Sequence, residues 1–304
     1  MVPHRGAGVG IRGIPDPQAP GLCQGGPVTT SPSTTGSLMS TESWAVAAPQ
    51  TIDVEQATGV TLRLQDGRAD VVADPAATGV RIELLEVGAK PLQVTRDGDR
   101  LRVGYESTVL DAVWAKLRNP RQSERAVVRV VVPADGAVDV GTLGADVEVT
   151  GGRKVAVKTV TGGVRTTGTT GPMSLRTVSG AVSAEEHTGD VAANSAAGSI
   201  ALSGALARVS LTTVSGAATV TATQVSPLIT AKTVSGAIDL RLPAGTPVNL
   251  KVRGASGQVV LDGSVLPSAG ATLVVDHGEQ PADGRSAAYL SATVTSAHVA
   301  VDRR

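Results

Sequence analysis

Thr177-Val178-Ser179-Gly180 is the stretch that decides the fold, because close variants of it return along the chain. Thr159-Val160-Thr161-Gly162, Thr213-Val214-Ser215-Gly216 and Thr233-Val234-Ser235-Gly236 repeat the phrase, and Ser195-Ala196-Ala197-Gly198 fills the gap between them. The last residues fall at 162, 180, 198, 216 and 236, so the steps are 18, 18, 18 and 20 residues. A period near 18 is typical of a stacked repeat protein.

Aliphatic residues recur at fixed offsets from the last residue of each unit, which we number 0. In the Gly180 unit, Met173 and Leu175 stand at −7 and −5, and Val182 and Ala184 at +2 and +4. Alternating pairs predict two short strands per unit, with alternate side chains inward. We therefore predict an all-β fold, a parallel β-solenoid (single-stranded β-helix) with ~18-residue coils. A left-handed hexapeptide helix would need aliphatic residues every six positions, whereas the spacing here is nine.

Weaker copies extend the pattern to seven coils over residues 138–261. Irregular strands over 44–133 and closing strands over 262–304 complete one predicted solenoid domain, 39–304. Residues 1–38 contain eight Gly and six Pro, a composition that predicts a disordered tail. We expect translation to start at Met39, with a genuine flexible tail as the alternative.

The repeated phrase itself predicts a corner between the two strands. Positions −5 and −2 are both mostly apolar, so we expect the valine at −2 to point inward, and Val214→Asp to cost several kcal/mol. Glycine at 0 suits a corner that needs a positive φ angle. The Thr column at −3 and the Ser/Thr column at −1 predict hydrogen bonds between stacked coils. The alternative is a flat Thr-rich face like those of ice-binding solenoids.

Composition and charge argue against several function classes. The formal net charge is +0, so we expect no bulk attraction to nucleic acid or to a membrane surface. Cys23 is the only cysteine, which excludes a disulfide within the chain. We see neither the ~20 consecutive apolar residues of a membrane span nor a secretory signal. We therefore expect a cytoplasmic protein, with envelope association as the alternative.

Residues 108–118 interrupt the strand pattern with helical spacing. This segment predicts a short amphipathic helix that acts either as a docking or membrane-surface element or as a cap on the solenoid. Its apolar positions are Val109, Leu110, Val113, Trp114 and Leu117. Trp114 and Leu117 are therefore candidate partner-binding residues.

Position −4 carries a partly basic column. Coils stack about 4.8 Å apart, so residues at this offset are expected to line up and could hold an anionic polymer or an acidic protein. An ordinary solvated face is the alternative interpretation. The column comprises Lys158, Arg176, Asn194, Thr212, Lys232 and Arg253.

The sequence offers no catalytic, cofactor-binding or metal-binding residue. Glu185-Glu186-His187 is the best local cluster, and we expect it to be a solvated turn. Calcium-binding β-rolls require Gly-Gly-x-Gly-x-Asp turns, which T-V-S-G does not match. Enzymes on polysaccharides need paired acids and usually aromatic residues, and no aromatic residue lies between 145 and 257. We therefore predict that the protein is not an enzyme, with an uncharacterised polymer-acting enzyme as an alternative.

Repeated T-V-S-G with flanking V-x-V pairs resembles a bacterial family of β-strand-repeat proteins of unknown function, often labelled candidate adhesins or toast-rack-like domains. The resemblance covers roughly residues 40–304 and implies a single-stranded β-solenoid without established catalytic residues. Many relatives are tied to membranes or envelope stress through a transmembrane segment or signal. Together these features predict a non-catalytic scaffold or binding module that presents its repeats to an unknown protein or anionic partner. A cell-surface adhesin is the alternative.

Overall fold

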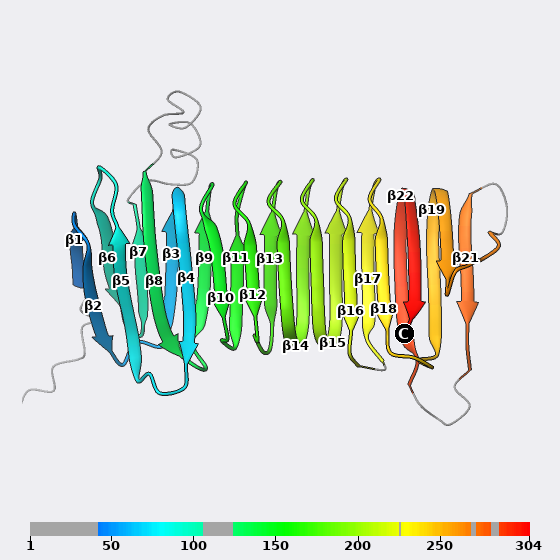
Figure 1. Cartoon of the computed structure of the whole chain (residues 1–304), viewed down its shortest axis with the longest axis horizontal. Coiled ribbons are helices and arrows are strands. Elements are labelled where there is room, and N and C mark those ends of the chain that lie inside the picture. The colour runs from blue at the N-terminus through cyan, green and yellow to red at the C-terminus, as the bar shows by residue number, and fades with distance from the viewer. Residues whose placement is uncertain (1–41, 106–123, 225, 269–271, 281–285) are drawn as a thin grey trace, which may run out of the picture. The chain divides into compact units, whose positions relative to one another are not determined.

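The computed structural model describes residues 42–105, 124–224, 226–268, 272–280 and 286–304. All the regular secondary structure within these ranges is β-strand, and neighbouring coils stand side by side (Figure 1). Each coil contributes one strand to each of two faces, as the alternating pairs predicted. The predicted parallel β-solenoid is therefore confirmed.

The first face, called face 1, contains the strands that lead into the corner phrase. Its strands are hydrogen-bonded in the following spatial order: β1 (Glu42–Val46), β6 (Leu92–Asp97), β7 (Arg100–Gly104), β3 (Gly59–Leu64), β9 (Ala137–Thr142), β11 (Lys154–Lys158), β13 (Met173–Thr177), the second half of β14 (Val182–Ser195), the second half of β15 (Ile200–Thr213), β17 (Leu228–Thr233), the first half of β22 (Ala288–Arg303), the first half of β19 (Val248–Leu261) and β21 (Leu273–Gly278).

The second face, called face 2, contains the strands that follow the corner. Its spatial order is β2 (Gln50–Glu55), β5 (Gly79–Glu86), β8 (Arg125–Pro133), β4 (Asp66–Asp74), β10 (Asp146–Thr150), β12 (Val164–Thr167), the first halves of β14 and β15, β16 (Ala218–Ala222), β18 (Ile238–Leu242), the second halves of β22 and β19, and β20 (Ser264–Val265).

Strand direction changes only toward the two ends of the stack. Pairing is parallel through the central coils, so residues at equal offsets are aligned from coil to coil. The outer strands β1, β2, β5 and β6 pair antiparallel at one end, and β20 and β21 do so at the other. Short antiparallel strands thus cover the regular coils, whose open edges would otherwise invite pairing with other chains.

The order of the coils differs from the order of the chain at both ends. Strand β22 lies between β17/β18 and β19, although the sequence pattern places its residues beyond the last coil. Likewise β3 and β4 lie between β7/β8 and β9/β10, so β8 precedes β9 in the chain but is not stacked against the first regular coil. All coils carry similar aliphatic columns, and the alternation therefore identifies strands without identifying their neighbours.

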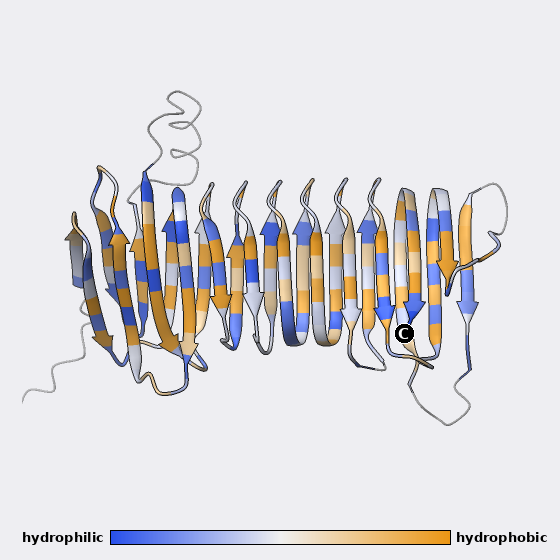
Figure 2. Cartoon of the chain, in the orientation of Figure 1, coloured by the Kyte–Doolittle hydropathy of each residue, from blue (hydrophilic) through white to orange (hydrophobic). Residues whose placement is uncertain are grey.

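The core lies between the two faces and consists of the predicted inward columns. Figure 2 shows hydrophobic and hydrophilic residues alternating along the strands. At position +2 no residue is more than 4% exposed, and alanine is accepted beside larger aliphatic side chains in neighbouring coils. The column comprises Val164, Val182, Ile200, Ala218 and Ile238.

The corner valines face solvent, so the prediction that they point inward is wrong. Val178 and Val214 are each 50% exposed and Val234 is 46% exposed. Strict alternation from −7 and −5 continues to −3, where Thr177 is 7% exposed and Thr213 is 3% exposed. A buried threonine is tolerated because its hydroxyl accepts a hydrogen bond from the glycine N–H of the same corner. Val214→Asp therefore places its charge at the surface.

The corner glycines are required by close packing, and the expected positive φ angle is wrong for them. A Cβ on Gly180 would lie 2.0 Å from the carbonyl oxygen of Gly162, and a Cβ on Gly198 would lie 2.0 Å from that of Gly180. No side-chain carbon fits at such a distance from backbone atoms of the preceding coil. Glycine thus allows successive corners to stack directly on one another.

The hydroxyl columns form hydrogen bonds, but only one column does so mainly between coils. Ser179 Oγ donates to the Val160 carbonyl and Ser215 Oγ to the Ala196 carbonyl, each at 3.3 Å. These bonds confirm the prediction for position −1. At −3 the hydroxyls bind mainly within their own corner, although Thr142 Oγ1 also donates to Thr159 Oγ1 of the next coil at 3.0 Å.

Candidate binding surface

The residues at position −4 form an aligned outward column on face 1. Backbone register places Lys158 beside Arg176, and Thr212 beside Lys232. Asn194 continues the column between Arg176 and Thr212. Because β22 is inserted, Thr293 separates Lys232 from Arg253. The structure thus brings the four predicted cations onto one face, with Lys158 and Arg176 adjacent and Lys232 and Arg253 each set apart by polar side chains.

Other cations widen this column into a basic face. The outward positions of face 1 from β11 to β19 carry seven cations, and Asp190 is their only acidic residue. None of the seven forms an ion pair with the part of the chain that the structure describes. We call this set the basic face; it comprises Lys154, Lys158, Arg176, Arg208, Lys232, Lys251 and Arg253.

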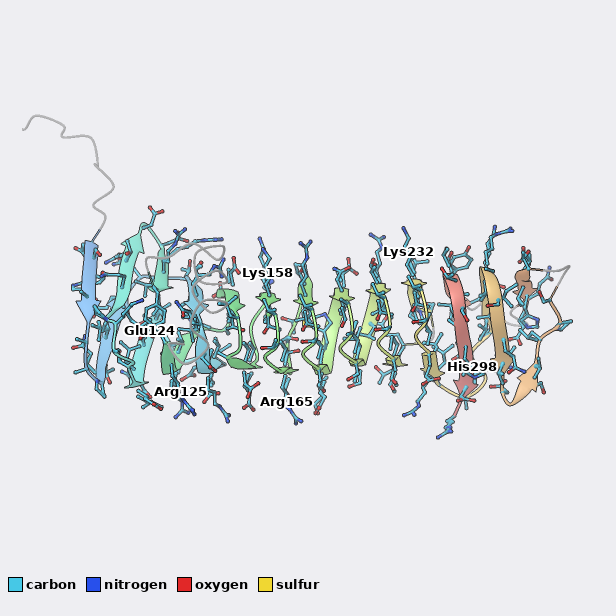
Figure 3. All side chains as sticks on the ribbon, turned by 90° about the horizontal axis from the view of Figure 1, so that it is seen from above. Glu124, Arg125, Lys158, Arg165, Lys232 and His298 are labelled. Carbon is cyan, nitrogen blue, oxygen red and sulfur yellow. The ribbon has the colours of Figure 1, made fainter. Side chains whose placement is uncertain are left out.

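Face 2 carries the opposite excess of charge. Figure 3 shows Lys158 and Lys232 projecting from one side of the stack and Arg165 from the other. The two cations on outward positions from β10 to β19 are Arg165 and Arg241. The formal net charge of +0 conceals this segregation, which sequence reasoning missed because it followed a single offset. The acidic outward residues of this region are Asp146, Glu148, Glu185, Asp239 and Asp302.

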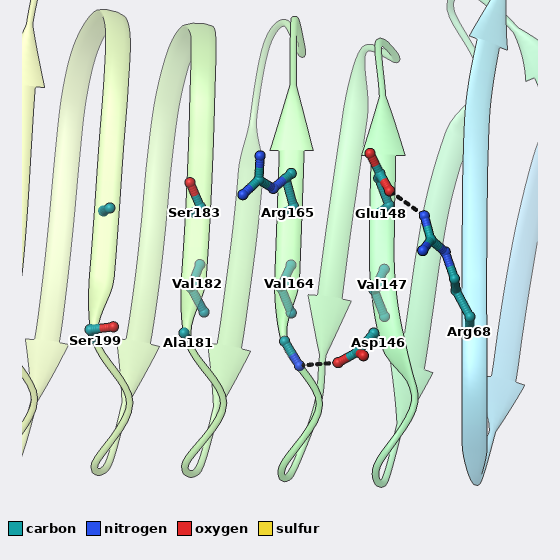
Figure 4. A pocket seen from close by; sticks show the side chains of 12 residues that line it. Arg68, Asp146, Val147, Glu148, Val164, Arg165, Ala181, Val182, Ser183 and Ser199 are labelled. Carbon is teal, nitrogen blue, oxygen red and sulfur yellow. Dashed lines mark hydrogen bonds and ion pairs between the residues drawn. The ribbon is translucent and has the colours of Figure 1, made fainter.

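A shallow depression of about 370 Å³ lies on face 2 (Figure 4). Charged groups at its rim already have partners. Arg68 Nη2 donates to Glu148 Oε2 at 2.6 Å, and Asp146 accepts from the Gly163 N–H at 2.8 Å. The hydrogen bond to Asp70 and its negative charge raise the pKa of Arg68, which stays protonated. This depression therefore offers a ligand few unpaired polar groups.

His187 is buried, so the prediction of a solvated turn at Glu185-Glu186-His187 is wrong for this residue. Its side chain is 0% exposed within β14. Nδ1 lies 2.8 Å from Thr169 Oγ1, whereas Nε2 has no hydrogen-bond partner in the described part of the chain. In the described ranges no three His, Cys, Asp or Glu side chains gather into a group that could hold a metal ion. This burial could not be predicted from the sequence, because the residue follows two glutamates at a β-bulge.

Burial of His187 predicts a measurable pH dependence of stability. Desolvation lowers the pKa of the folded imidazole below its ordinary 6.5, so the unfolded chain binds this proton more readily. The stability is fully present above pH 6.5 and is lost as the pH falls from there toward the lowered pKa. Urea unfolding between about pH 5 and 7.5 should show this slope, and His187→Leu should flatten it. Equal slopes in the two proteins would contradict the assignment.

Two acidic side chains share one arginine at the end of β22. Arg303 Nε donates to Asp262 Oδ2 and Arg303 Nη1 to Glu279 Oε2, each at 2.7 Å. The Arg303 hydrogen bonds lower the pKa of Asp262. Burial favours a higher pKa for Glu279, but the Val248 N–H, His277 and Arg303 hold it below its ordinary value. A glycosidase needs one carboxyl of raised pKa, and neither of these meets that requirement.

Two predicted partner-binding residues, Trp114 and Leu117, lie outside the described residues, as does the whole segment 108–118. In the chain this segment follows β7 and precedes β8. Its predicted helix stays a prediction.

Comparisons with known proteins find solved structures that are similar to this chain. No curated protein matches the sequence. A solved candidate adhesin from Bacteroides fragilis NCTC 9343 is 14% identical, with a TM-score of 0.45, over 84% of this chain and 96% of that one. A candidate adhesin from Parabacteroides distasonis ATCC 8503 is 9% identical, with a TM-score of 0.38, over 86% and 97%.

The sequence also matches a family over most of its length. Among the described residues, no helix has the length and apolar character needed to cross a bilayer. The family description Toastrack DUF4097 matches residues 52–265, which include the strands from β3 to β20. This match confirms the resemblance drawn from the repeated phrase. Because it spans more than half of the 304 residues, the chain belongs to the Toastrack DUF4097 family.

Proposed function

We propose that this protein is a non-catalytic binding module whose basic face holds an anionic partner. The observation that carries the proposal is the row of aligned cations on face 1, unpaired in the described part of the chain. Hydrogen bonds hold equivalent positions of neighbouring coils about 4.8 Å apart, so the backbone that carries these cations loses little conformational entropy when a partner binds. The acidic excess on face 2 directs such a partner to face 1.

The chemistry of the described acids and histidines supports a role without catalysis. Asp262 and Glu279 are held ionised by Arg303, and His187 is sealed in the core. A general acid or base needs access to a substrate and a pKa near the working pH. An enzyme acting on a polymer, the alternative drawn from the sequence, would have to use other groups.

Neutralising three cations of the column should weaken binding of a simple polyanion. We expect Lys158→Gln/Arg176→Gln/Lys232→Gln to bind poly-L-glutamate about tenfold more weakly, because three exposed ion pairs of about 0.5 kcal/mol each sum to about 1.5 kcal/mol, and tenfold corresponds to about 1.4 kcal/mol. Fluorescence anisotropy of labelled polymer at two salt concentrations measures the affinity, and the variant should lose part of the salt dependence.

A matched control separates the basic face from total charge. Arg129→Gln/Arg165→Gln/Arg241→Gln removes three cations from outward positions of face 2 and gives the same net charge. Its affinity for poly-L-glutamate should stay within about twofold of the parent protein, a change of roughly 0.4 kcal/mol. Equal losses in the two variants would show that net charge, and not face 1, determines binding.

We further propose that the module acts in the cytoplasm. The alternative is an envelope-associated adhesin, the description given to the compared structures from Bacteroides and Parabacteroides. Cell fractionation with an antibody against residues 42–304 distinguishes the two. Recovery in the envelope fraction, with protease accessibility on intact cells, would replace the cytoplasmic proposal.

A further inference from the structure

The residues at position −2 form an aligned, mostly apolar row along the stack, in which the partly buried Ala196 stands between Val178 and Val214. Val178, Val214 and Val234 are 46–50% exposed, and the core does not need them because threonine at −3 is the inward residue. Backbone bonds between corners, such as Ala197 N–H to the Val178 carbonyl at 2.8 Å, hold the row in register. Single exposed valines are common, but a contiguous row marks an interaction surface. We call this row the valine ridge; it comprises Val160, Val178, Ala196, Val214 and Val234.

The valine ridge runs directly beside the basic column. Positions −4 and −2 both face solvent and are two residues apart, so Arg176 neighbours Val178 and Lys232 neighbours Val234. Since coils are stacked in register, the two rows stay parallel from β11 to β17. A partner that matches this edge must present an apolar stripe with carboxylates along one side.

A hollow of about 300 Å³ lies at the N-terminal end of the valine ridge. Leu143, Val160 and Tyr105 contribute to its wall, and Lys158 stands at its rim. The Tyr105 hydroxyl is buried there and has no hydrogen-bond partner among the described residues, and burial together with Glu124 raises the pKa of Tyr105 to about 12. The phenol is therefore neutral at physiological pH. Such a hollow suits one large apolar side chain as an anchor.

We propose that the partner docks through an acidic amphipathic α-helix laid along this edge. Its apolar stripe covers the valine ridge, and its carboxylates face Lys158, Arg176 and Lys232. The proposal rests on the proposed function and specifies the kind of anionic partner.

Spacing favours a helix over an extended strand. Helical turns repeat every ~5.4 Å, near the ~4.8 Å between coils, whereas side chains on one side of a strand repeat every ~6.6 Å. Four coil steps separate Val160 from Val234, about 19 Å, which a helix of roughly 13 residues spans at ~1.5 Å per residue. The partner element is therefore three to four turns long.

The test compares two peptides of identical composition on the full-length protein. One carries Leu at helical i, i+3, i+4 and i+7 positions with Glu along the adjacent side; the other has the same residues scrambled. We expect the amphipathic peptide to bind about tenfold more tightly, because only it presents a continuous apolar stripe. Val178→Ser/Val214→Ser should remove that preference, while poly-L-glutamate still binds.

Control variants and alternative occupants decide the outcome. Leu85→Ser/Val265→Ser changes two equally exposed apolar side chains away from the edge and should keep the preference. Equal affinity for the two peptides, or no effect of Val178→Ser/Val214→Ser, would overturn the helix proposal. It would also be overturned if the valine ridge proved necessary for binding phosphatidylserine vesicles or for dimerisation, with no preference between peptides. Failure of the proposed function is distinct, since poly-L-glutamate binding would then ignore the neutralised column.

Discussion

Replacing Gly198 by alanine should destabilise the protein by about 3 kcal/mol or more, the upper range for forcing atoms into a packed interior. The new Cβ would stand 2.0 Å from the carbonyl oxygen of Gly180 and 2.8 Å from its carbonyl carbon. Both are backbone atoms of the preceding corner, so no side-chain rotation relieves the contact. Separating the coils instead would lengthen bonds such as Ala197 N–H to the Val178 carbonyl.

Ala196→Val in the same corner is the matched control. It adds two methyl groups at position −2, where neighbouring coils already carry Val178 and Val214 facing solvent. We expect a change within about 0.5 kcal/mol. Urea unfolding followed by circular dichroism measures both variants. If Gly198→Ala cost as little as the control, direct stacking of the corner glycines would be disproved.

The fold was predictable from the sequence because each coil repeats the same local physics. Alternation at −7, −5, +2 and +4 depends only on near neighbours in the chain, and Val155, Met173 and Val191 stack as their equal offsets predict. The position of β22 between β17/β18 and β19 depends on which edge the returning chain meets, and aliphatic columns do not encode that choice. Chain order is therefore a poor guide at the ends of a repeat array.

The prediction that the valine at position −2 points inward is wrong because it gave more weight to apolar character than to the alternation along the strand. Val214 is apolar, but the alternation that buries Val209 and Leu211 continues to Thr213. A threonine can take the inward place because a partner for its hydroxyl, the Gly216 N–H, lies within the same tetrapeptide. The repeat indicates that the corner requires glycine, but it does not reveal the reason. The close contact with the carbonyl oxygen of the preceding corner exists only when the coils are stacked.

The candidate site was only partly visible in the sequence. The −4 column emerged from the repeat offsets, and the structure aligns Lys158 with Arg176 as expected. Two features required three dimensions: the segregation of charge between the faces, and the row of valines beside the column. Thr293 also enters the column from a strand distant in sequence.

Two single substitutions at neighbouring positions of one corner test which of the two side chains points inward. Thr213→Val should cost about 1–3 kcal/mol, because Gly216 loses the hydroxyl that accepts its buried N–H at 3.1 Å. Val214→Thr makes the reverse change one residue later at a side chain that is 50% exposed, and should cost no more than about 0.5 kcal/mol. Unfolding free energies in urea measure the difference.

An equal cost for the two substitutions, or a larger cost for Val214→Thr, would mean that valine is the inward residue after all. The valine ridge would then be part of the core and could not receive a partner. The expected order has the opposite consequence. It shows that position −2 can be altered without unfolding the coil, so that a loss of peptide binding in ridge variants reports on the surface itself. The stability experiment on Thr213 and Val214 thus decides whether the binding experiment can be interpreted.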